Sequence, residues 1–175
     1  MSDALPHLVT LGLGGNIGDP GRAMADALRA LDARADCGIV AVSRLYRTPP
    51  WGKTDQADFF NACAALRTSL SPEDLIALCL DIERNMKRVR DERWGPRTLD
   101  IDILTFGDLA LETERLVIPH PRMTERGFVL MPLADIAGAM TVRGRAVSGW
   151  LAEADTAGIA VAEENRDWWR QSLSR

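Results

Sequence analysis

Apolar residues recur along the chain in alternating strand-like and helix-like segments. Residues 8–13 form an apolar run that ends at two glycines, which predicts a strand followed by a tight turn. From Asp19-Pro20 to about residue 34 the apolar positions recur at helical spacing, which predicts a helix. Residues 39–47 alternate as a second strand, and the Pro49-Pro50 pair ends it.

The next part of the chain adds a strand, a helix and another strand. Residues 60–68 predict a third strand, and Ser71-Pro72 begins a helix that should run to about Lys87, because serine caps a helix and proline suits its first turn. Residues 99–104 then predict a fourth strand. The order β-α-β-β-α-β is that of the ferredoxin-like split βαβ unit. We therefore expect an α+β ferredoxin-like sandwich, with helices packed on a mainly antiparallel sheet.

The last part of the chain predicts shorter elements, among them a return segment over 109–117 and a helical stretch over 128–136. No repeat, low-complexity segment or linker divides the sequence, and 175 residues suit one hydrophobic core. We therefore expect residues 1–175 to form a single domain.

Composition and charge narrow the class of protein. No apolar run approaches the roughly 18 residues that cross a bilayer, and the first residues lack the pattern of a secretory signal, so we expect a cytoplasmic protein with no membrane partner. The net charge of −4 argues against a nucleic-acid partner. Cys37, Cys63 and Cys79 lack C-x-x-C spacing, which predicts buried free thiols and neither a zinc site nor a disulfide framework.

Two nucleotide-binding patterns in the sequence are incomplete. Residues 12–17 resemble a dinucleotide fingerprint, but Ile17 stands where the third glycine is needed. Gly52-Lys53-Thr54 resembles the end of a Walker A loop, but Arg47 stands where its first glycine is needed. Pro49-Pro50 also lacks the backbone N–H groups that hold phosphate in such a loop. Neither a Rossmann site nor a P-loop is therefore expected.

Asp100 and Asp102 are two residues apart on the fourth predicted strand. Their carboxylates should leave the same face, roughly 6.6 Å apart along the strand, while Leu99, Ile101 and Ile103 face the core. Carboxylates on one rigid element can hold Mg²⁺ ions for phosphoryl chemistry. A solvated strand face is the alternative for an isolated acidic pair, but the cations just upstream favour a metal site.

Six cations lie between Arg84 and Arg97, with two acids among them. Guanidinium groups form bidentate pairs with phosphate oxygens, and a Gly-Pro pair restricts the shape of this loop. A solvated helix end is the alternative interpretation, but it explains neither the carboxylates beside the loop nor the Gly-Pro pair. A nucleotide triphosphate is the natural partner of such a stretch.

A second patch combines an aromatic ring with an amide. Phe59 and Asn61, two apart, could present both groups on one side, where a planar heterocycle would stack on the ring and hydrogen-bond the amide. Taken alone, Phe59 is more simply a core residue and Asn61 a strand-end residue. His120, between two prolines, is by itself more often a loop histidine than a catalyst.

Together these motifs resemble the 6-hydroxymethyl-7,8-dihydropterin pyrophosphokinase family, from residue 11 to about residue 137. The most specific run is Arg93-Trp94-Gly95-Pro96-Arg97-Thr98-Leu99-Asp100-Ile101-Asp102. The supporting runs are Leu13-Gly14-Gly15-Asn16-Ile17-Gly18-Asp19, Tyr46-Arg47-Thr48-Pro49-Pro50, Phe59-Phe60-Asn61, Ile118-Pro119-His120-Pro121 and Arg126-Gly127-Phe128-Val129-Leu130.

The resemblance implies a monomeric Mg²⁺-dependent enzyme that transfers diphosphate from ATP to 6-hydroxymethyl-7,8-dihydropterin in folate biosynthesis, with AMP as the other product. It implies that Asp100 and Asp102 hold two Mg²⁺ ions, and that Arg88 and Arg97 are also catalytic. The nucleotide contacts that it implies are Arg90, Trp94, Ile103, His120 and Arg126. The pterin contacts that it implies are Thr48, Pro50, Trp51, Phe59, Asn61 and Phe128, with Phe59 and Phe128 on the two faces of the ring.

Without the resemblance, the residues indicate a metal-dependent enzyme or binder of a nucleotide phosphate. A Mg²⁺-dependent phosphohydrolase is disfavoured, because no His, Glu or Asp outside the metal pair stands in an obvious position to activate water. A ferredoxin-like regulatory or RNA-binding module is disfavoured by the acidic net charge and by the lack of regularly placed strand aromatics.

Overall fold

The computed structural model describes residues 4–50, 55–88 and 99–171. The first elements are β1 (His7–Gly15), α1 (Pro20–Asp32), β2 (Cys37–Val42), β3 (Leu45–Thr48), β4 (Phe59–Thr68), α2 (Pro72–Arg88) and β5 (Asp100–Phe106). They are followed by β6 (Leu111–Glu112), β7 (Val117–Ile118), the 3-10 helix η2 (Met123–Glu125), α3 (Gly127–Ala137), β8 (Thr141–Val142), β9 (Arg145–Ala146), α4 (Val147–Glu153) and β10 (Ala160–Glu163).

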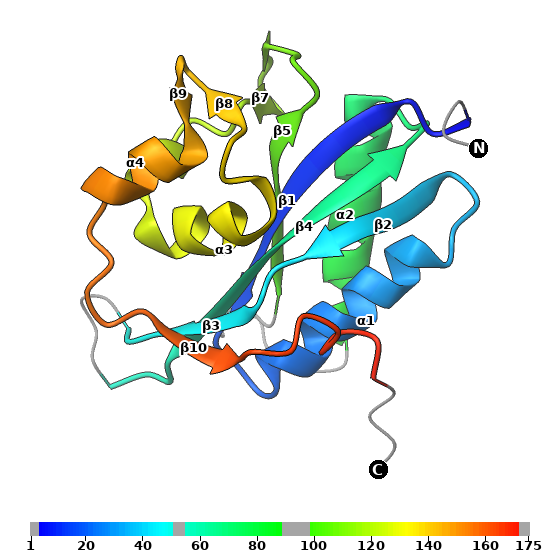
Figure 1. The fold of residues 1–175 in the computed structure, drawn as a ribbon. Helices are drawn as coiled ribbons and strands as arrows, with labels where there is room; N and C mark the ends of the chain where they lie inside the picture. The colour runs from blue at the N-terminus through cyan, green and yellow to red at the C-terminus, as the bar shows by residue number, and fades with distance from the viewer. Residues whose placement is uncertain (1–3, 51–54, 89–98, 172–175) are drawn as a thin grey trace.

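The main sheet has six strands, in the order β10-β3-β4-β1-β5, with β2 also paired to β4. Every pair in it is antiparallel. Figure 1 shows α1 and α2 on one face of this sheet and α3 on the other. The element order and the antiparallel pairing confirm the expected α+β ferredoxin-like sandwich.

The segment predicted as one strand over 39–47 is two strands, β2 and β3, and Ser43 explains the break. The backbone N–H of Cys63 on β4 donates to the hydroxyl oxygen of Ser43, at 2.9 Å, in place of a carbonyl oxygen. The Ser43 carbonyl instead accepts the indole N–H of Trp168, also at 2.9 Å. The Ser43 side chain and the distant Trp168 therefore take the place of backbone partners at this point of the sheet. The alternation of residues along the strand does not reveal such a break.

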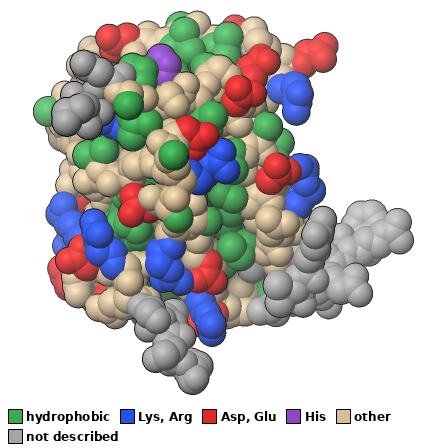
Figure 2. Space-filling model, turned by 90° about the vertical axis from the view of Figure 1, so that its right-hand side faces the viewer, with side chains coloured by type: hydrophobic (Ala, Val, Ile, Leu, Met, Phe, Trp, Pro, Cys, Tyr) green, Lys and Arg blue, Asp and Glu red, His purple; other side chains and the backbone are tan. Residues whose placement is uncertain are grey.

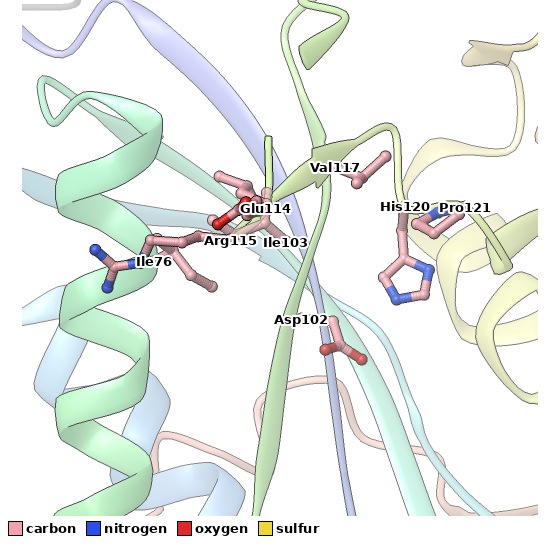
Figure 3. Close-up of a pocket in the computed structure, with 9 residues that line it drawn as sticks. Ile76, Asp102, Ile103, Glu114, Arg115, Val117, His120 and Pro121 are labelled. Carbon is pink, nitrogen blue, oxygen red and sulfur yellow. The ribbon is translucent and has the colours of Figure 1, made fainter. Parts of the chain in front are cut away.

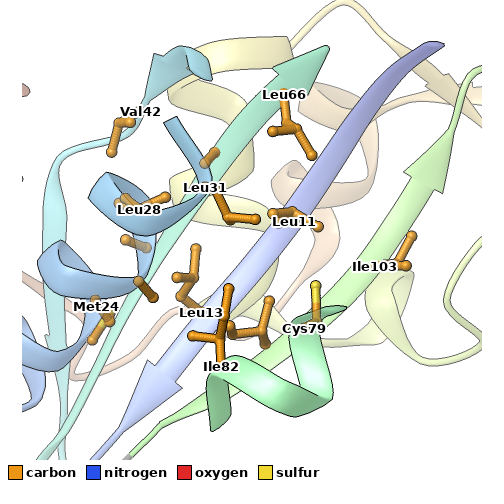
Figure 4. Close-up of a cluster of buried hydrophobic side chains, with 14 of the residues drawn as sticks. Leu11, Leu13, Met24, Leu28, Leu31, Val42, Leu66, Cys79, Ile82 and Ile103 are labelled. Carbon is orange, nitrogen blue, oxygen red and sulfur yellow. The ribbon is translucent and has the colours of Figure 1, made fainter. Parts of the chain in front are cut away.

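The sheet separates two hydrophobic clusters. The larger cluster lies between the sheet and α1 and α2, and Figure 4 shows Leu11 and Leu13 of β1 within it, next to Leu28 of α1. It also holds Trp168 and Trp169, so the tail packs into this core. The smaller cluster lies beneath α3 and α4, and its buried members are Cys63, Leu104, Met123, Leu130, Leu133, Val142 and Val147.

The three cysteines are buried and free, as predicted. Cys37 and Cys79 belong to the larger cluster and Cys63 to the smaller one. Burial raises the pKa of Cys63 and also raises that of Cys79, the latter to about 12.

On the face that Figure 2 displays, acidic and basic side chains alternate among apolar ones and no wide region of one sign is visible. No helix within the described ranges is long and apolar enough to span a membrane.

Asp135 of α3 attaches this helix to β3. Its carboxylate accepts hydrogen bonds from the Tyr46 hydroxyl at 2.8 Å and from the backbone N–H of Arg44 at 3.1 Å. It also accepts the Arg44 guanidinium at 3.1 Å, and the Asp135 side chain is only 8% exposed. Burial alone would raise the pKa of Asp135, but the hydrogen bonds from Arg44 and Tyr46 outweigh it and hold the pKa below its ordinary value.

Replacing Asp135 with Asn should lower the free energy of unfolding by about 1–3 kcal/mol at pH 7, because charged hydrogen bonds in a largely buried site are lost. A lowered pKa in the folded state stabilises the protein above the unfolded pKa, and this contribution disappears as the pH falls through the folded value. The difference between wild type and D135N should therefore shrink below about pH 4. Urea titrations from pH 7 to pH 3 measure it, and a difference that does not change with pH would contradict this account.

Candidate functional site

Five predicted site residues lie on one face of the sheet, the face that also carries α3. Thr48 of β3 is paired with Phe59 of β4, and Asn61 is two residues further along the same strand. Asp100 and Asp102 lie on β5, on the other side of β1. Paired residues share a face, as do residues two apart on one strand. The strand register therefore brings the aromatic and amide patch and the acidic pair together.

Two glycines of β1 form the floor between these groups. Gly14 is paired with Asn61 on one side and with Asp100 on the other, and Gly12 is paired with Asp102. A Cβ atom added at Gly14 would lie 2.6 Å from the Asn61 side-chain oxygen. The Asn61 amide therefore occupies space that any other residue at position 14 would fill.

The sequence interpretation missed this role, because it ended the first strand at residue 13 and placed Gly14 and Gly15 in a turn. The structure continues β1 through Gly15. Gly12 and Gly14, two residues apart in an otherwise apolar segment, could have indicated this role, because glycines within a strand often mark a close approach by another group.

The expected alternation along β5 is confirmed. Ile101 and Ile103 are buried in the larger cluster, while Asp100 is half-buried and Asp102 is exposed. Glu83 of α2, itself buried, accepts the backbone N–H of Ile101 at 2.6 Å. This contact fixes the start of β5, and with it the two aspartates, relative to α2.

The acidic pair fits Mg²⁺ held jointly with a phosphate. Within residues 4–50, 55–88 and 99–171, no three His, Cys, Asp or Glu side chains are grouped so that they could hold a metal. Mg²⁺ usually takes only one or two carboxylates from a protein and completes its shell with phosphate oxygens and water. Asp100 and Asp102 supply that number of carboxylates.

A hollow of about 240 Å³ lies beside the acidic pair (Figure 3). Asp102 and His120 border it on one side, and the predicted nucleotide residue Ile103 contributes to its wall although its side chain is buried. The other lining residues, which the sequence interpretation did not identify, are Ile76, Glu114, Arg115, Leu116, Val117 and Pro121. Ile76 comes from α2, residues 114–117 from the β6–β7 hairpin and Pro121 from the segment after β7, so only the tertiary structure brings them together.

The imidazole of His120 is held in one orientation. Its Nδ1 accepts the backbone N–H of Arg122 at 3.2 Å, and its own backbone N–H donates to the Leu104 carbonyl at 2.9 Å. Burial lowers the pKa of His120; the charge of Asp102 opposes this effect, and nearby arginines reinforce it. A neutral His120 with Nδ1 as acceptor carries its proton on Nε2, where it can donate a hydrogen bond.

Arg126 and Phe128 lie together at the start of α3. The guanidinium carbon of Arg126 is 5.6 Å from the centre of the Phe128 ring, within the range of a cation–π contact. On the sheet, the hydroxyl oxygen of Thr48 is buried and has no hydrogen-bond partner among the described residues. Buried polar atoms are almost always paired, so this orphaned hydroxyl is consistent with a bound ligand.

Some predicted site residues lie outside the described part of the chain. They are Trp51, Arg90, Trp94 and Arg97. Arg88 is the last residue of α2, and its side chain also lies outside the description. Pro50 is described and half-buried, directly after β3 and Pro49.

Sequence comparisons identify close relatives. Residues 10–138 match the family model of 7,8-dihydro-6-hydroxymethylpterin-pyrophosphokinase. A relative from Methylorubrum extorquens is 48% identical over 153 residues, which cover 87% of this chain and 97% of the relative. A relative from Bacillus subtilis is 43% identical over 155 residues, covering 89% and 90%. Both are named 2-amino-4-hydroxy-6-hydroxymethyldihydropteridine pyrophosphokinase.

Solved structures share the fold. The chain is similar to wild-type Plasmodium falciparum HPPK-DHPS with pteroate, with a TM-score of 0.67 and 16% identity. The match covers 84% of this chain and 44% of that longer one. The likeness supports the architecture alone, whereas the sequence matches establish that the chain belongs to the 7,8-dihydro-6-hydroxymethylpterin-pyrophosphokinase family.

Proposed function

We propose that the protein transfers diphosphate from Mg²⁺-bound ATP to 6-hydroxymethyl-7,8-dihydropterin in folate biosynthesis, giving AMP and the pterin diphosphate. One observation carries the proposal. The acidic pair on β5 and the Phe59–Asn61 patch on β4 share one face of the sheet, with only the glycines of β1 between them. A phosphate donor held at Asp100 and Asp102 would therefore lie beside a heterocycle held at Asn61.

The hollow beside Asp102 is the proposed nucleotide site. Its wall includes apolar side chains, such as Ile76 and Val117, and the cation of Arg115. Apolar side chains suit a nucleoside, and a cation suits the phosphates attached to it. His120 borders the hollow and can donate from Nε2 to a phosphate oxygen. Arg126 would add a cation near the same phosphates, and the family resemblance supports Arg88, Arg90, Arg97 and Trp94 as further nucleotide contacts.

The proposed pterin slot lies at the other end of the glycine floor. Phe59 and Phe128 would stack on the two faces of the ring, and Asn61 would hydrogen-bond its edge. The buried hydroxyl of Thr48, which has no hydrogen-bond partner among the described residues, supports a ligand in this region. The family resemblance adds Pro50 and Trp51 to the slot.

In the proposed reaction the pterin hydroxymethyl oxygen attacks the β-phosphorus of ATP. A bond forms between that oxygen and the β-phosphorus, and the bond from the β-phosphorus to the α,β-bridging oxygen breaks, so that AMP leaves with that oxygen and the hydroxyl proton passes to water. Two Mg²⁺ ions held by Asp100 and Asp102 would neutralise charge on the phosphates. His120 and Arg126 would donate to phosphate oxygens. Such a loose transition state depends mainly on positioning and charge neutralisation, so it needs little help from a strong base.

We also propose that residues 1–175 act as one domain, as a monomer and in the cytoplasm, on these small molecules and without a nucleic-acid partner. The packing of Trp168 and Trp169 into the core that holds β1 and α1 supports one domain.

Phosphorus NMR of the protein with Mg²⁺-ATP, with and without the hydroxymethyl pterin, tests the function. AMP and a pterin diphosphate should form only when the pterin is present. ADP with a pterin monophosphate would overturn the diphosphate assignment, and nucleotide hydrolysis that does not need the pterin would indicate a phosphohydrolase.

Replacing both Asp100 and Asp102 with Asn should lower turnover by about 100-fold or more, because the ligands of the charge-neutralising ions are removed. The fold should persist, since neither side chain is buried in the core. Turnover at saturating Mg²⁺-ATP and the free energy of unfolding are the two measurements. Near-normal turnover in the double variant would remove these residues from the metal site.

Replacing Phe59 or Phe128 with Ala should weaken pterin binding about tenfold, since stacking and apolar burial are both lost, while ATP binding is spared. Calorimetric titration with each substrate measures both affinities. Unchanged pterin affinity in both variants would place the slot elsewhere.

A further inference from the structure

Residues Asp155–Glu163, which we call the C-terminal strap, follow α4 and include β10. They lie beyond residues 10–138, the part of the chain that matches the family model. In Figure 1 this segment descends from α4 past the start of α3 and joins β3 at the edge of the sheet. The strap thereby passes α3, which carries Phe128, and β3, which carries Thr48.

The first contact of the strap is with the start of α3. Gly127 is buried, and a Cβ atom added there would overlap the carbonyl oxygen of Asp155 and lie 3.3 Å from the Thr156 methyl group. The backbone of the strap therefore lies directly against the residue that precedes Phe128.

The second contact is with the end of β3. Gly158 has a φ of +82°, and a Cβ atom added there would lie 3.0 and 3.1 Å from two ring carbons of Pro49. Just beyond it, β10 pairs with β3, with Ala160 opposite Arg47. The strap therefore touches the residue between Thr48 and Pro50, two of the residues proposed to line the pterin slot.

The strap is itself held in place. Between the two contacts, the backbone N–H of Ala157 donates to the Asp155 carboxylate at 3.0 Å, and that of Ile159 to the Thr156 carbonyl at 3.1 Å. After β10, the Arg166 guanidinium donates to the Asp135 carbonyl of α3 at 2.9 Å. The two contacts are thus joined by a short, hydrogen-bonded piece of backbone.

We infer that the strap sets the distance between Phe128 at the start of α3 and the Thr48–Pro50 segment after β3, which makes Gly158 a positioning residue for pterin binding. This inference rests on the proposed function. It predicts that a displacement of Pro49 by a side chain at position 158 weakens pterin binding selectively, because the nucleotide hollow lies on the other side of β1 and does not contact the strap.

The matched substitutions G158N and G144N test the inference. Gly144 has the same φ, +82°, but nothing lies within 4 Å of a Cβ atom added there. Asn tolerates positive φ better than most residues, so both variants should fold. G158N should weaken the affinity for hydroxymethyl pterin about three- to tenfold, through a shift of a few tenths of an ångström. G144N should leave it unchanged, and neither should alter the affinity for a non-hydrolysable ATP analogue.

Removing the ring of Pro49 provides a rescue. The double variant G158N/P49A should recover most of the lost pterin affinity, which a purely structural defect would not do. Should G158N fail to fold, G158A with G144A as its control makes the same comparison.

Each result bears on a separate claim. Equal pterin affinity in G158N and G144N, or a parallel loss of pterin and ATP affinity in G158N, would overturn the inference alone. A wild-type protein that binds no hydroxymethyl pterin would overturn the proposed function and this inference with it.

Discussion

The rest of the molecule depends on one constraint, which is that the two faces of β1 serve different purposes. As an interior strand of the sheet, β1 is hydrogen-bonded to β4 on one side and β5 on the other. Its residues Val9, Leu11 and Leu13 are buried in the larger core. The alternate positions Gly12 and Gly14 lie on the opposite face and carry no side chains. One strand therefore stabilises the fold with one face and leaves open the floor of the candidate site with the other.

The parts of the fold that depend on local pattern could be predicted from the sequence. The helix that begins at Pro20 and the strand that contains Asp100 and Asp102 both follow from spacing and capping residues. The break at Ser43 could not be predicted, because it depends on hydrogen bonds to Cys63 and Trp168, which are distant in the sequence. Strand β10 has the sequence Ala-Val-Ala-Glu, which does not alternate between apolar and polar residues, and all four residues are exposed, so it is a strand only through its pairing with β3.

The same distinction applies to the candidate site. The shared face of Phe59 and Asn61 follows from two-residue spacing on one strand, and the structure places both on the side that carries Asp100. The hollow beside Asp102 is different, because its wall joins Ile76 of α2 to Arg115 and Val117 of a short hairpin. No local pattern links residues so far apart in the chain. The structural role of Gly14 was concealed for another reason, since a pair of glycines is equally typical of a turn.

The buried cysteines make it possible to follow the opening of each hydrophobic cluster to water separately. Each hydrophobic cluster contains at least one buried thiol: Cys63 lies beneath α3, and Cys37 and Cys79 lie on the side of α1 and α2. Burial raises the pKa values of all three, so the reactive thiolate is scarce while the cores are closed. Alkylation of each cysteine therefore depends on how often its own cluster opens to water. Peptide mapping of the alkylated protein would separate the opening of the layer that carries Phe128 from that of the layer behind the sheet.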